Sequence, residues 1–259
     1  MEWLKIFFLG IIQGITEFLP ISSSGHLVIF QRLFGISSNQ LTINVFLHIG
    51  TVIPVIIIFW NDIRDILLFK KEKRRLTWLI IFGIIPTGLI GLYFKDFFEG
   101  LFASVRNVGF MLLITGLLLL LSEKISRVRF NIDKMKGYNA VIVGIAQGLA
   151  VIPGISRSGS TIAASLLQGL DRESAARYSF LISLPVILGA GLVELKDLTL
   201  SSMEGLSWSM LITGMLAAAI SGYFAIKYLI HILKKGSLVI FTYYCWGLGF
   251  LIILLAGLL

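Results

Sequence analysis

Long apolar stretches separated by short polar connections recur along the whole chain. A helix that crosses a bilayer needs about 20 mostly apolar residues, and somewhat fewer when residues at its ends can snorkel. Six stretches without Asp, Glu, Lys or Arg meet this requirement and predict membrane-spanning helices: Leu33–Asn61, Leu76–Phe94, Asn107–Ser122, Tyr178–Val193, Gly205–Ile226 and Gly236–Leu259.

Two further apolar stretches are each interrupted near the middle by one charged residue. Ile6–Gln31 contains Glu17, and Tyr138–Leu170 contains Arg157. Pro and Gly-Ser clusters accompany both ions, and such clusters unwind helices. Because unwound backbone at membrane depth is tolerated only inside protein or beside water, we expect two re-entrant broken-helix hairpins in addition to the six spanning helices.

The two interrupted stretches resemble each other at an offset of 134 residues, where eight of the sixteen positions from Gly10 to Gly25 match identical residues in Gly144–Gly159. The repeats cover residues 1–122 and 138–259, and each holds one interrupted stretch and three spans. An odd number of crossings inverts the second repeat relative to the first. The pattern predicts one all-α integral membrane domain, 1–259, built as an inverted-topology repeat.

Composition and charge agree with a membrane protein. Apolar residues make up 57% of the chain and charged residues only 14%, against about 25% charged in soluble domains. With re-entrant hairpins, sixteen Lys and Arg fall in connections on one side and five on the other. The positive-inside rule assigns the richer side to the cytoplasm and both termini to the outside. The net charge of +8 is then a topology signal, and no nucleic-acid partner is expected.

Two hairpins that meet near the midplane bring an acidic and a basic motif together. Arg157 needs an anion there, because an unpaired charge at the centre of a helix costs about 2.5–3.5 kcal/mol. Glu17 is one candidate partner. Phosphate is the other, because the break offers hydroxyls, backbone N–H groups and a half-helix N-terminus. The residues predicted to bind a phosphorylated substrate are Arg157, Ser22, Ser24, Ser156, Ser158, Ser160 and Thr161.

Gln13 and Glu17 lie four residues apart and project from one face of a helix. A carboxylate beside a phosphate predicts a divalent cation, Mg²⁺ or Ca²⁺, held by these two residues. Ser23 is the preferred nucleophile and His26, three residues further on, its base. A cation-activated water and His26 itself are alternative nucleophiles. Nucleophile, base, cation ligand and phosphate clamp together indicate a phosphatase.

Three other features are interpreted as structural. His48 lies in a spanning stretch and reads as a helix-packing or cavity residue. His231 reads as a solvated loop residue close to two lysines. Asp171–Arg177 reads as a surface turn with local i,i+4 ion pairs.

The segment Gln13–His26 reads QGITEFLPISSSGH and resembles the glutamate-rich motif of the bacterial undecaprenyl-diphosphatase family, the bacitracin-resistance proteins. Pro153–Thr161, PGISRSGST, resembles the second motif of that family. The resemblance implies cation-dependent hydrolysis of undecaprenyl diphosphate to the monophosphate and inorganic phosphate, which recycles the lipid carrier for cell-wall synthesis. It also implies a site open to the outer face of the bacterial cytoplasmic membrane. The active-site residues that it implies are Glu17, Ser23, His26, Ser156, Arg157 and Thr161.

A transporter or flippase of a phosphorylated lipid or anion is the alternative, because inverted repeats with broken helices also build transporters. His26 close to Ser23 and Glu17 favours hydrolysis, since transport of a phosphate does not require such a group. A channel or scaffold leaves Glu17 and Arg157 unexplained. A homodimer is compatible with this family resemblance.

Overall fold

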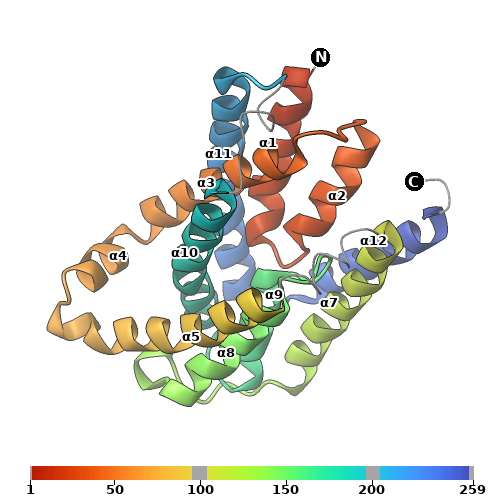
Figure 1. Cartoon of the computed structure of the whole chain (residues 1–259). Helices are drawn as coiled ribbons and strands as arrows, with labels where there is room; N and C mark the ends of the chain where they lie inside the picture. Colours follow the sequence, from red (N-terminus) through yellow and green to blue (C-terminus); the bar gives the residue numbers. More distant parts are fainter. Residues whose placement is uncertain (1, 95–103, 197–204, 257–259) are drawn as a thin grey trace.

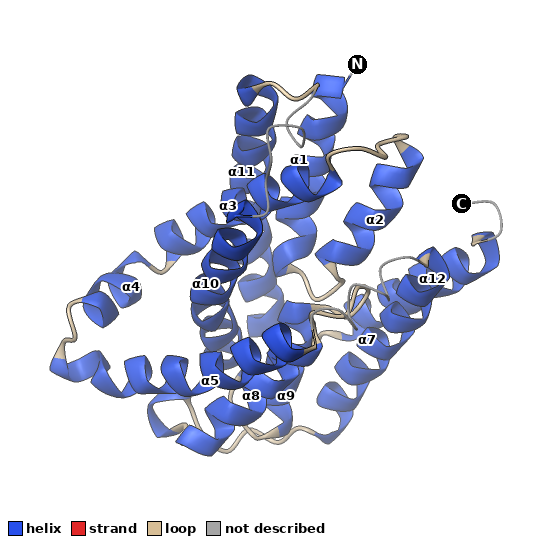
Figure 2. Ribbon diagram, in the orientation of Figure 1, coloured by secondary structure: helices blue, strands red, loops and turns tan. Residues whose placement is uncertain are grey.

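The computed structural model describes residues 2–94, 104–196 and 205–256 (Figure 1). No strand occurs among these residues (Figure 2). The helices are α1 Glu2–Phe18, α2 Ser23–Leu33, α3 Gln40–Ile58, α4 Trp60–Leu67, η1 Lys71–Lys73, α5 Arg74–Tyr93, α7 Val105–Ile125, η2 Ile132–Lys134, α8 Gly137–Leu149, α9 Arg157–Leu167, α10 Arg172–Lys196, α11 Trp208–Lys235 and α12 Val239–Leu255.

Five described helical segments are long and apolar enough to cross a membrane, which confirms an all-helical integral membrane protein. They are Gln40–Ile58, Lys71–Tyr93, Val105–Ile125, Arg172–Glu194 and Trp208–Lys234, and they match five of the six predicted spans. The sixth predicted span forms α12, which is apolar but has only 17 residues. Its predicted end at 257–259, and most of the connection 95–106, lie outside the described residues.

Each interrupted stretch forms two helices joined by a short non-helical segment. The first break separates the end of α1 at Phe18 from the start of α2 at Ser23, and the second separates the end of α8 at Leu149 from the start of α9 at Arg157. Helices α2, α5 and α7 begin at Ser23, Arg74 and Val105, and helices α9, α11 and α12 begin 134 positions later, at Arg157, Trp208 and Val239.

The helices pack in pairs that correspond under this offset. Helix α1 lies along α11, α8 lies along α5, and α7 lies beside α12 (Figure 1). Glycines permit the close approach, since a Cβ atom on Gly14 would lie 2.1 Å from the Oγ of Ser221, and one on Gly144 would lie 2.1 Å from the backbone oxygen of Gly83. Small residues spaced by four are a common helix interface in membranes.

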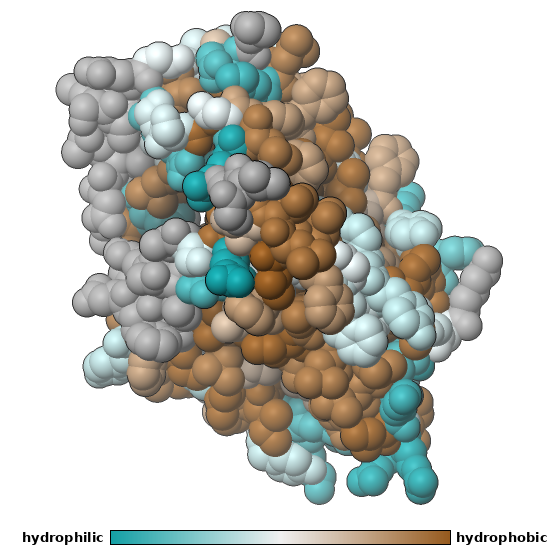
Figure 3. Space-filling model, turned by 90° about the vertical axis from the view of Figure 1, so that its right-hand side faces the viewer, coloured by the Kyte–Doolittle hydropathy of each residue, from teal (hydrophilic) through white to brown (hydrophobic). Residues whose placement is uncertain are grey.

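The outer surface is largely apolar. Apolar side chains cover the middle of the face in Figure 3, and hydrophilic residues lie at its upper and lower edges and to the left of its centre. Ile220 and Phe224 of α11 and Leu254 of α12 are among the exposed large hydrophobic residues. An apolar surface of this extent is what contact with lipid requires.

Two structural interpretations of the sequence are wrong. His231 is exposed, but it lies inside α11 and not in a loop. The basic residues of Asp171–Arg177 do not form local pairs, because Arg172 donates to both carboxylate oxygens of Glu123 in α7, at 2.6 and 2.8 Å. Arg177 instead binds Asp62 of α4, with 2.7 Å between its Nε and Oδ2. These ion pairs connect different helices.

Candidate active site

Glu17 lies on the last turn of α1, directly before the first break, and it is buried. Gln13 lies one helical turn earlier on the same face, so its side-chain amide can reach the carboxylate. The Nε2 of Gln13 donates to Oε2 of Glu17 at 2.8 Å. The predicted pairing of these two residues on one helix face is present.

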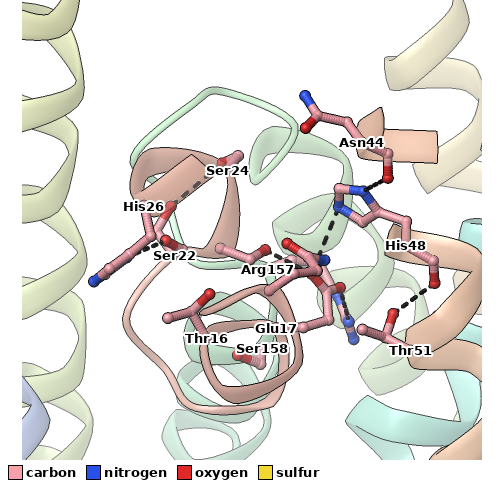
Figure 4. A network of polar contacts seen from close by, with 12 residues as sticks. Thr16, Glu17, Ser22, Ser24, His26, Asn44, His48, Thr51, Arg157 and Ser158 are labelled. Carbon is pink, nitrogen blue, oxygen red and sulfur yellow. Dashed lines mark hydrogen bonds and ion pairs between the residues drawn. The ribbon is translucent and has the colours of Figure 1, made fainter. Parts of the chain in front are cut away.

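Arg157 is the first residue of α9, directly after the second break. Its Nη2 donates to Oε1 of Glu17 at 2.7 Å, and the guanidinium is largely buried (Figure 4). The two ions are 140 positions apart in the sequence. The structure therefore brings the acidic and basic motifs together.

Ser23 begins α2 and donates from Oγ to Oε2 of Glu17 at 2.5 Å. The preceding Ser22 caps the helix, and its Oγ accepts from the backbone N–H of Gly25 at 3.3 Å. Ser22 has a φ of 70°, a backbone conformation that costs free energy for a residue with a side chain. This sharp turn places the Ser23 hydroxyl against the carboxylate.

The sequence analysis pairs His26 with the Ser23 hydroxyl, but the ring nitrogens of His26 contact other groups. Its Nδ1 is 2.7 Å from the backbone oxygen of Ser22, and its Nε2 is 2.7 Å from the hydroxyl of Tyr244 in α12. The imidazole is buried and points away from Glu17 (Figure 4). The reason is local, because a residue four positions after Ser22 on a new helix projects back over the Ser22 carbonyl.

His48 of α3 lines the cavity at this site, which confirms its interpretation as a cavity residue, but the sequence analysis did not place it beside Glu17. Its Nε2 lies 3.6 Å from Oε2 of Glu17, and its Nδ1 lies 2.8 Å from the backbone oxygen of Asn44 (Figure 4). Its side chain is one-third exposed, at 33%. The sequence feature that indicates its role is the pair of polar residues Asn44 and His48, which are one helical turn apart within an apolar span.

A cavity of about 950 Å³ opens beside this cluster. Helices α1, α2, α3, α9 and α10 all contribute to its wall, which is mostly apolar along α10. It extends to the connection between α2 and α3, at Ser37. The cluster residues that line it are Glu17, Ser23, Ser24, His48 and Arg157.

The other predicted hydroxyl residues do not line the cavity, and three of them, Ser22, Ser156 and Ser158, stabilise the two breaks. Ser156 caps α9 by accepting from the N–H of Gly159 at 3.1 Å. Ser158 connects the breaks, because its Oγ donates to the backbone oxygen of Leu19 at 3.0 Å. Among the described residues, the buried Oγ of Ser160 has no hydrogen-bond partner. The remaining two are Ser22, described above, and Thr161, whose Oγ1 donates to the backbone oxygen of Arg157 at 2.9 Å.

The residues around Glu17 fit a hard divalent cation that takes its other ligands from substrate and water. The described chain holds no cluster of three His, Cys, Asp or Glu, so the protein offers no complete cage. The buried Oε1 of Gln13 has no hydrogen-bond partner in this part of the chain, and it belongs to the same side chain that contacts Glu17. One carboxylate and one amide oxygen suit Mg²⁺ or Ca²⁺ when phosphate oxygens complete the coordination.

Fold and site together define a multi-pass membrane protein with a buried carboxylate, a largely buried guanidinium and a serine hydroxyl in the wall of one cavity. A family model described as "Bacitracin resistance protein BacA" matches residues 6–251. The chain belongs to this family.

Similar proteins match over nearly their whole length. A protein from Halothermothrix orenii named undecaprenyl-diphosphatase is 66% identical over 257 residues, which cover 99% of each chain. Proteins of the same name from Carboxydothermus hydrogenoformans and Alkaliphilus metalliredigens are 48% and 44% identical, with 98% of each chain covered.

Proposed function

We propose that the protein is an undecaprenyl-diphosphatase, which hydrolyses undecaprenyl diphosphate to undecaprenyl phosphate and inorganic phosphate. The full-length identity to proteins of that name supports this activity, and these relatives lend no support to the transporter alternative. One structural observation carries the chemistry: Ser23 and Arg157 contact the same carboxylate, Glu17, at the end of one cavity.

Arg157 is the phosphate clamp in this proposal. Its Nη2 contacts Glu17, and its buried Nη1 has no hydrogen-bond partner among the described residues. A guanidinium can bind two phosphate oxygens at once. When the diphosphate enters the cavity, Arg157 binds the terminal phosphate and stabilises the charge that develops during phosphoryl transfer.

Ser23 is the nucleophile that the geometry favours, with Glu17 as the acceptor of its proton. As Ser23 Oγ forms a bond to the terminal phosphorus, its hydrogen passes to the Glu17 carboxylate, to which it is already hydrogen-bonded. The phosphoanhydride bond breaks, and its electron pair leaves with undecaprenyl phosphate. Water then hydrolyses the phosphoserine, which restores Ser23 and releases phosphate. Direct attack by water remains the alternative to the phosphoserine.

Glu17 and Gln13 would hold the divalent cation in this proposal, and the bound cation would neutralise negative charge on the substrate. Glu17 replaces His26 as the base in this proposal, because both ring nitrogens of His26 are hydrogen-bonded to other groups, Ser22 and Tyr244.

We further propose that both broken segments are re-entrant and that the chain forms an inverted repeat with six membrane-spanning helices. In this arrangement the cavity opens to the outside. The excess of basic residues in one set of connections supports the orientation. The cavity reaches Ser37, which lies in a connection assigned to the opposite, outer side. Both termini are outside in this arrangement. The broken segments and the 134-residue correspondence of helix starts support the repeat.

The direct test is phosphate release from undecaprenyl diphosphate by the purified protein in detergent. We expect turnover that EDTA abolishes and that added Mg²⁺ or Ca²⁺ restores. The variant Arg157→Ala should lose at least 100-fold in kcat/KM while it elutes as a monodisperse protein. Hydrolysis at the wild-type rate in this variant would refute the clamp, and lipid transfer across sealed vesicles without phosphate release would favour a transporter.

A further inference from the structure

Tyr244 of α12 connects the far end of the chain to the first motif. Its hydroxyl lies 2.7 Å from Nε2 of His26, and the two rings stack with 5.7 Å between centroids and 10° between planes. The neighbouring Cys245 places its Sγ 3.6 Å from the backbone oxygen of Pro20 in the first break. Helix α12 thus contacts the first break at Pro20 and the first turn of α2 at His26.

The hydrogen-bond partners determine where the hydrogen of His26 lies. The backbone oxygen of Ser22 can only accept, so Nδ1 of His26 carries the hydrogen and donates it. In the neutral ring Nε2 then has the lone pair, and the hydroxyl of Tyr244 donates to it. The Ser22 carbonyl therefore sets the tautomer. The hydroxyl of Tyr244 donates to the remaining lone pair and holds the ring in this orientation.

The contact between His26 and the Ser22 carbonyl affects Ser23, because Ser22 directly precedes Ser23 in the chain. Ser22 has the costly φ of 70°, and such a conformation persists only when surrounding contacts hold it. The Nδ1 of His26 binds the carbonyl of this residue, and Ser23 begins α2 at the next position. Loss of the His26 contact therefore loosens the turn that directs the Ser23 hydroxyl to Glu17.

We propose that Tyr244 is a positioning residue that acts through His26: its hydroxyl holds the imidazole in the orientation that supports the Ser22 turn and, with it, the Ser23 hydroxyl. The consequence for catalysis rests on the proposed diphosphatase activity. His26 contributes to that activity by supporting the backbone and does not itself remove a proton from Ser23.

The kinetic test compares Tyr244→Phe, which keeps the stacked ring and removes the hydroxyl, with Tyr243→Phe on the same helix. Tyr243 is 65% exposed, and we expect wild-type kinetics from its variant. Tyr244→Phe should lower kcat about tenfold with KM unchanged within twofold, because substrate binding is retained while the nucleophile is less well placed. A wild-type kcat in Tyr244→Phe would overturn the proposal.

A double-mutant cycle checks that the two residues act as one unit. We expect His26→Ala combined with Tyr244→Phe to be no slower than His26→Ala alone, since the hydroxyl acts only through the imidazole. Multiplied losses in the double variant would show that Tyr244 acts separately, which contradicts the proposal.

A substrate-free measurement separates this proposal from the proposed function. The chain has three histidines, so ¹⁵N-labelled imidazole resonances of His26 can be assigned after replacing His48 and His231. We expect Nδ1 of His26 to carry the hydrogen in the otherwise native protein. This Nδ1–H should exchange with solvent faster in Tyr244→Phe, because the imidazole has lost the donor that holds it. An Nε2–H form before substitution, or unchanged exchange of the Nδ1–H after it, would refute the role of Tyr244 even if hydrolysis is observed.

Discussion

Glu17 receives polar side chains from three separate segments of the chain. Ser23 and Arg157 donate to its two oxygens from α2 and α9, and His48 faces Oε2 from α3. A group held from several directions keeps one orientation, which is the condition for a preorganised site. His48 adds a neighbour from a helix that carries no part of either sequence motif.

We expect His48→Leu to lower kcat/KM about tenfold. The substitution removes one of the groups that orient Glu17 and makes the cavity wall beside it apolar, while roughly preserving volume. The measurement is the initial rate of phosphate release over a range of substrate concentrations. His231→Leu on the exposed face of α11 is the matched control and should behave as wild type. An unchanged kcat/KM in a folded His48→Leu variant would remove His48 from the site.

The sequence predicts the contact between Glu17 and Arg157 for a simple reason. Two isolated charges in apolar stretches each need a partner in the bilayer, and the repeat places them at equivalent breaks. The direction in which His26 points follows from the start of α2 directly after Ser22, and the sequence does not fix that start. Its second partner, Tyr244, is 218 positions away. The interpretation of His48 as a cavity residue is confirmed, but its place beside Glu17 depends on how α3 packs against the breaks.

At the scale of helices, the interface between α1 and α11 depends on the absence of side chains on one face of α1. Besides the close contact at Gly14, a Cβ atom on Gly10 would lie 2.3 Å from the backbone oxygen of Gly214. Helix α1 carries Glu17, so the depth at which it packs fixes the position of the carboxylate. The spacing of these glycines is visible in the sequence, but the partner helix is not.

We expect Gly14→Ala to destabilise the protein by about 1–3 kcal/mol, because the added methyl overlaps the backbone of α11 at Ala218. Thermal unfolding in detergent measures the effect as a lower midpoint. Gly91→Ala is the matched control, since this helical glycine has open space around its Cβ position. It should leave the midpoint unchanged or raise it slightly. Equal effects of the two substitutions would contradict close packing of α1 on α11.

The ion pairs of Asp62 connect α4 to α10 and η1. Lys73 donates to Oδ1 at 2.7 Å, and Arg177 binds both carboxylate oxygens. Burial raises the pKa of Asp62, but the hydrogen bonds and charges of Arg177 and Lys73 outweigh it and hold the pKa below its ordinary value. Such a carboxylate stabilises the fold above the pKa that it has when unfolded, about 3.9. The contribution disappears as the pH falls through the lower, folded-state pKa.

We therefore expect Asp62→Asn to reduce the free energy of unfolding by about 1–2 kcal/mol at neutral pH, since it leaves Arg177 without its charged partner. The difference from wild type should fade as the pH is lowered below about 4. Unfolding midpoints measured from pH 3 to pH 7 test this, and Asp65→Asn on the same helix is the control. A difference that grows toward acid pH would contradict the assigned sign.

At the scale of the whole molecule, hydropathy was enough to predict the class and most of the spans. Helices in a bilayer must satisfy their own backbone groups, so apolar length alone identifies them. The exception is α12, which is apolar but has only 17 residues. Homodimerisation stays a prediction, because surface contact with lipid and contact with a second copy have the same apolar composition.

The proposed orientation predicts which connections a membrane-impermeant maleimide reaches in intact cells. We expect labelling of Ser37→Cys, in the connection between α2 and α3, and protection of Lys71→Cys in the basic connection before α5. The native Cys245 is buried, and replacing it with Ala removes residual background. Labelling of both sites after membrane permeabilisation is the control. The reverse pattern in intact cells would place the cavity on the cytoplasmic side.

The pairing of Arg157 with Glu17 has a consequence for how strongly the protein retains its ligands. A phosphate that binds both terminal nitrogens of the guanidinium competes for Nη2 with an anion that the protein itself provides, so part of the binding energy is spent on that competition. When the reaction ends, the same carboxylate returns and competes with the departing phosphate. An internal competitor of this kind weakens product inhibition and favours rapid recycling over tight capture.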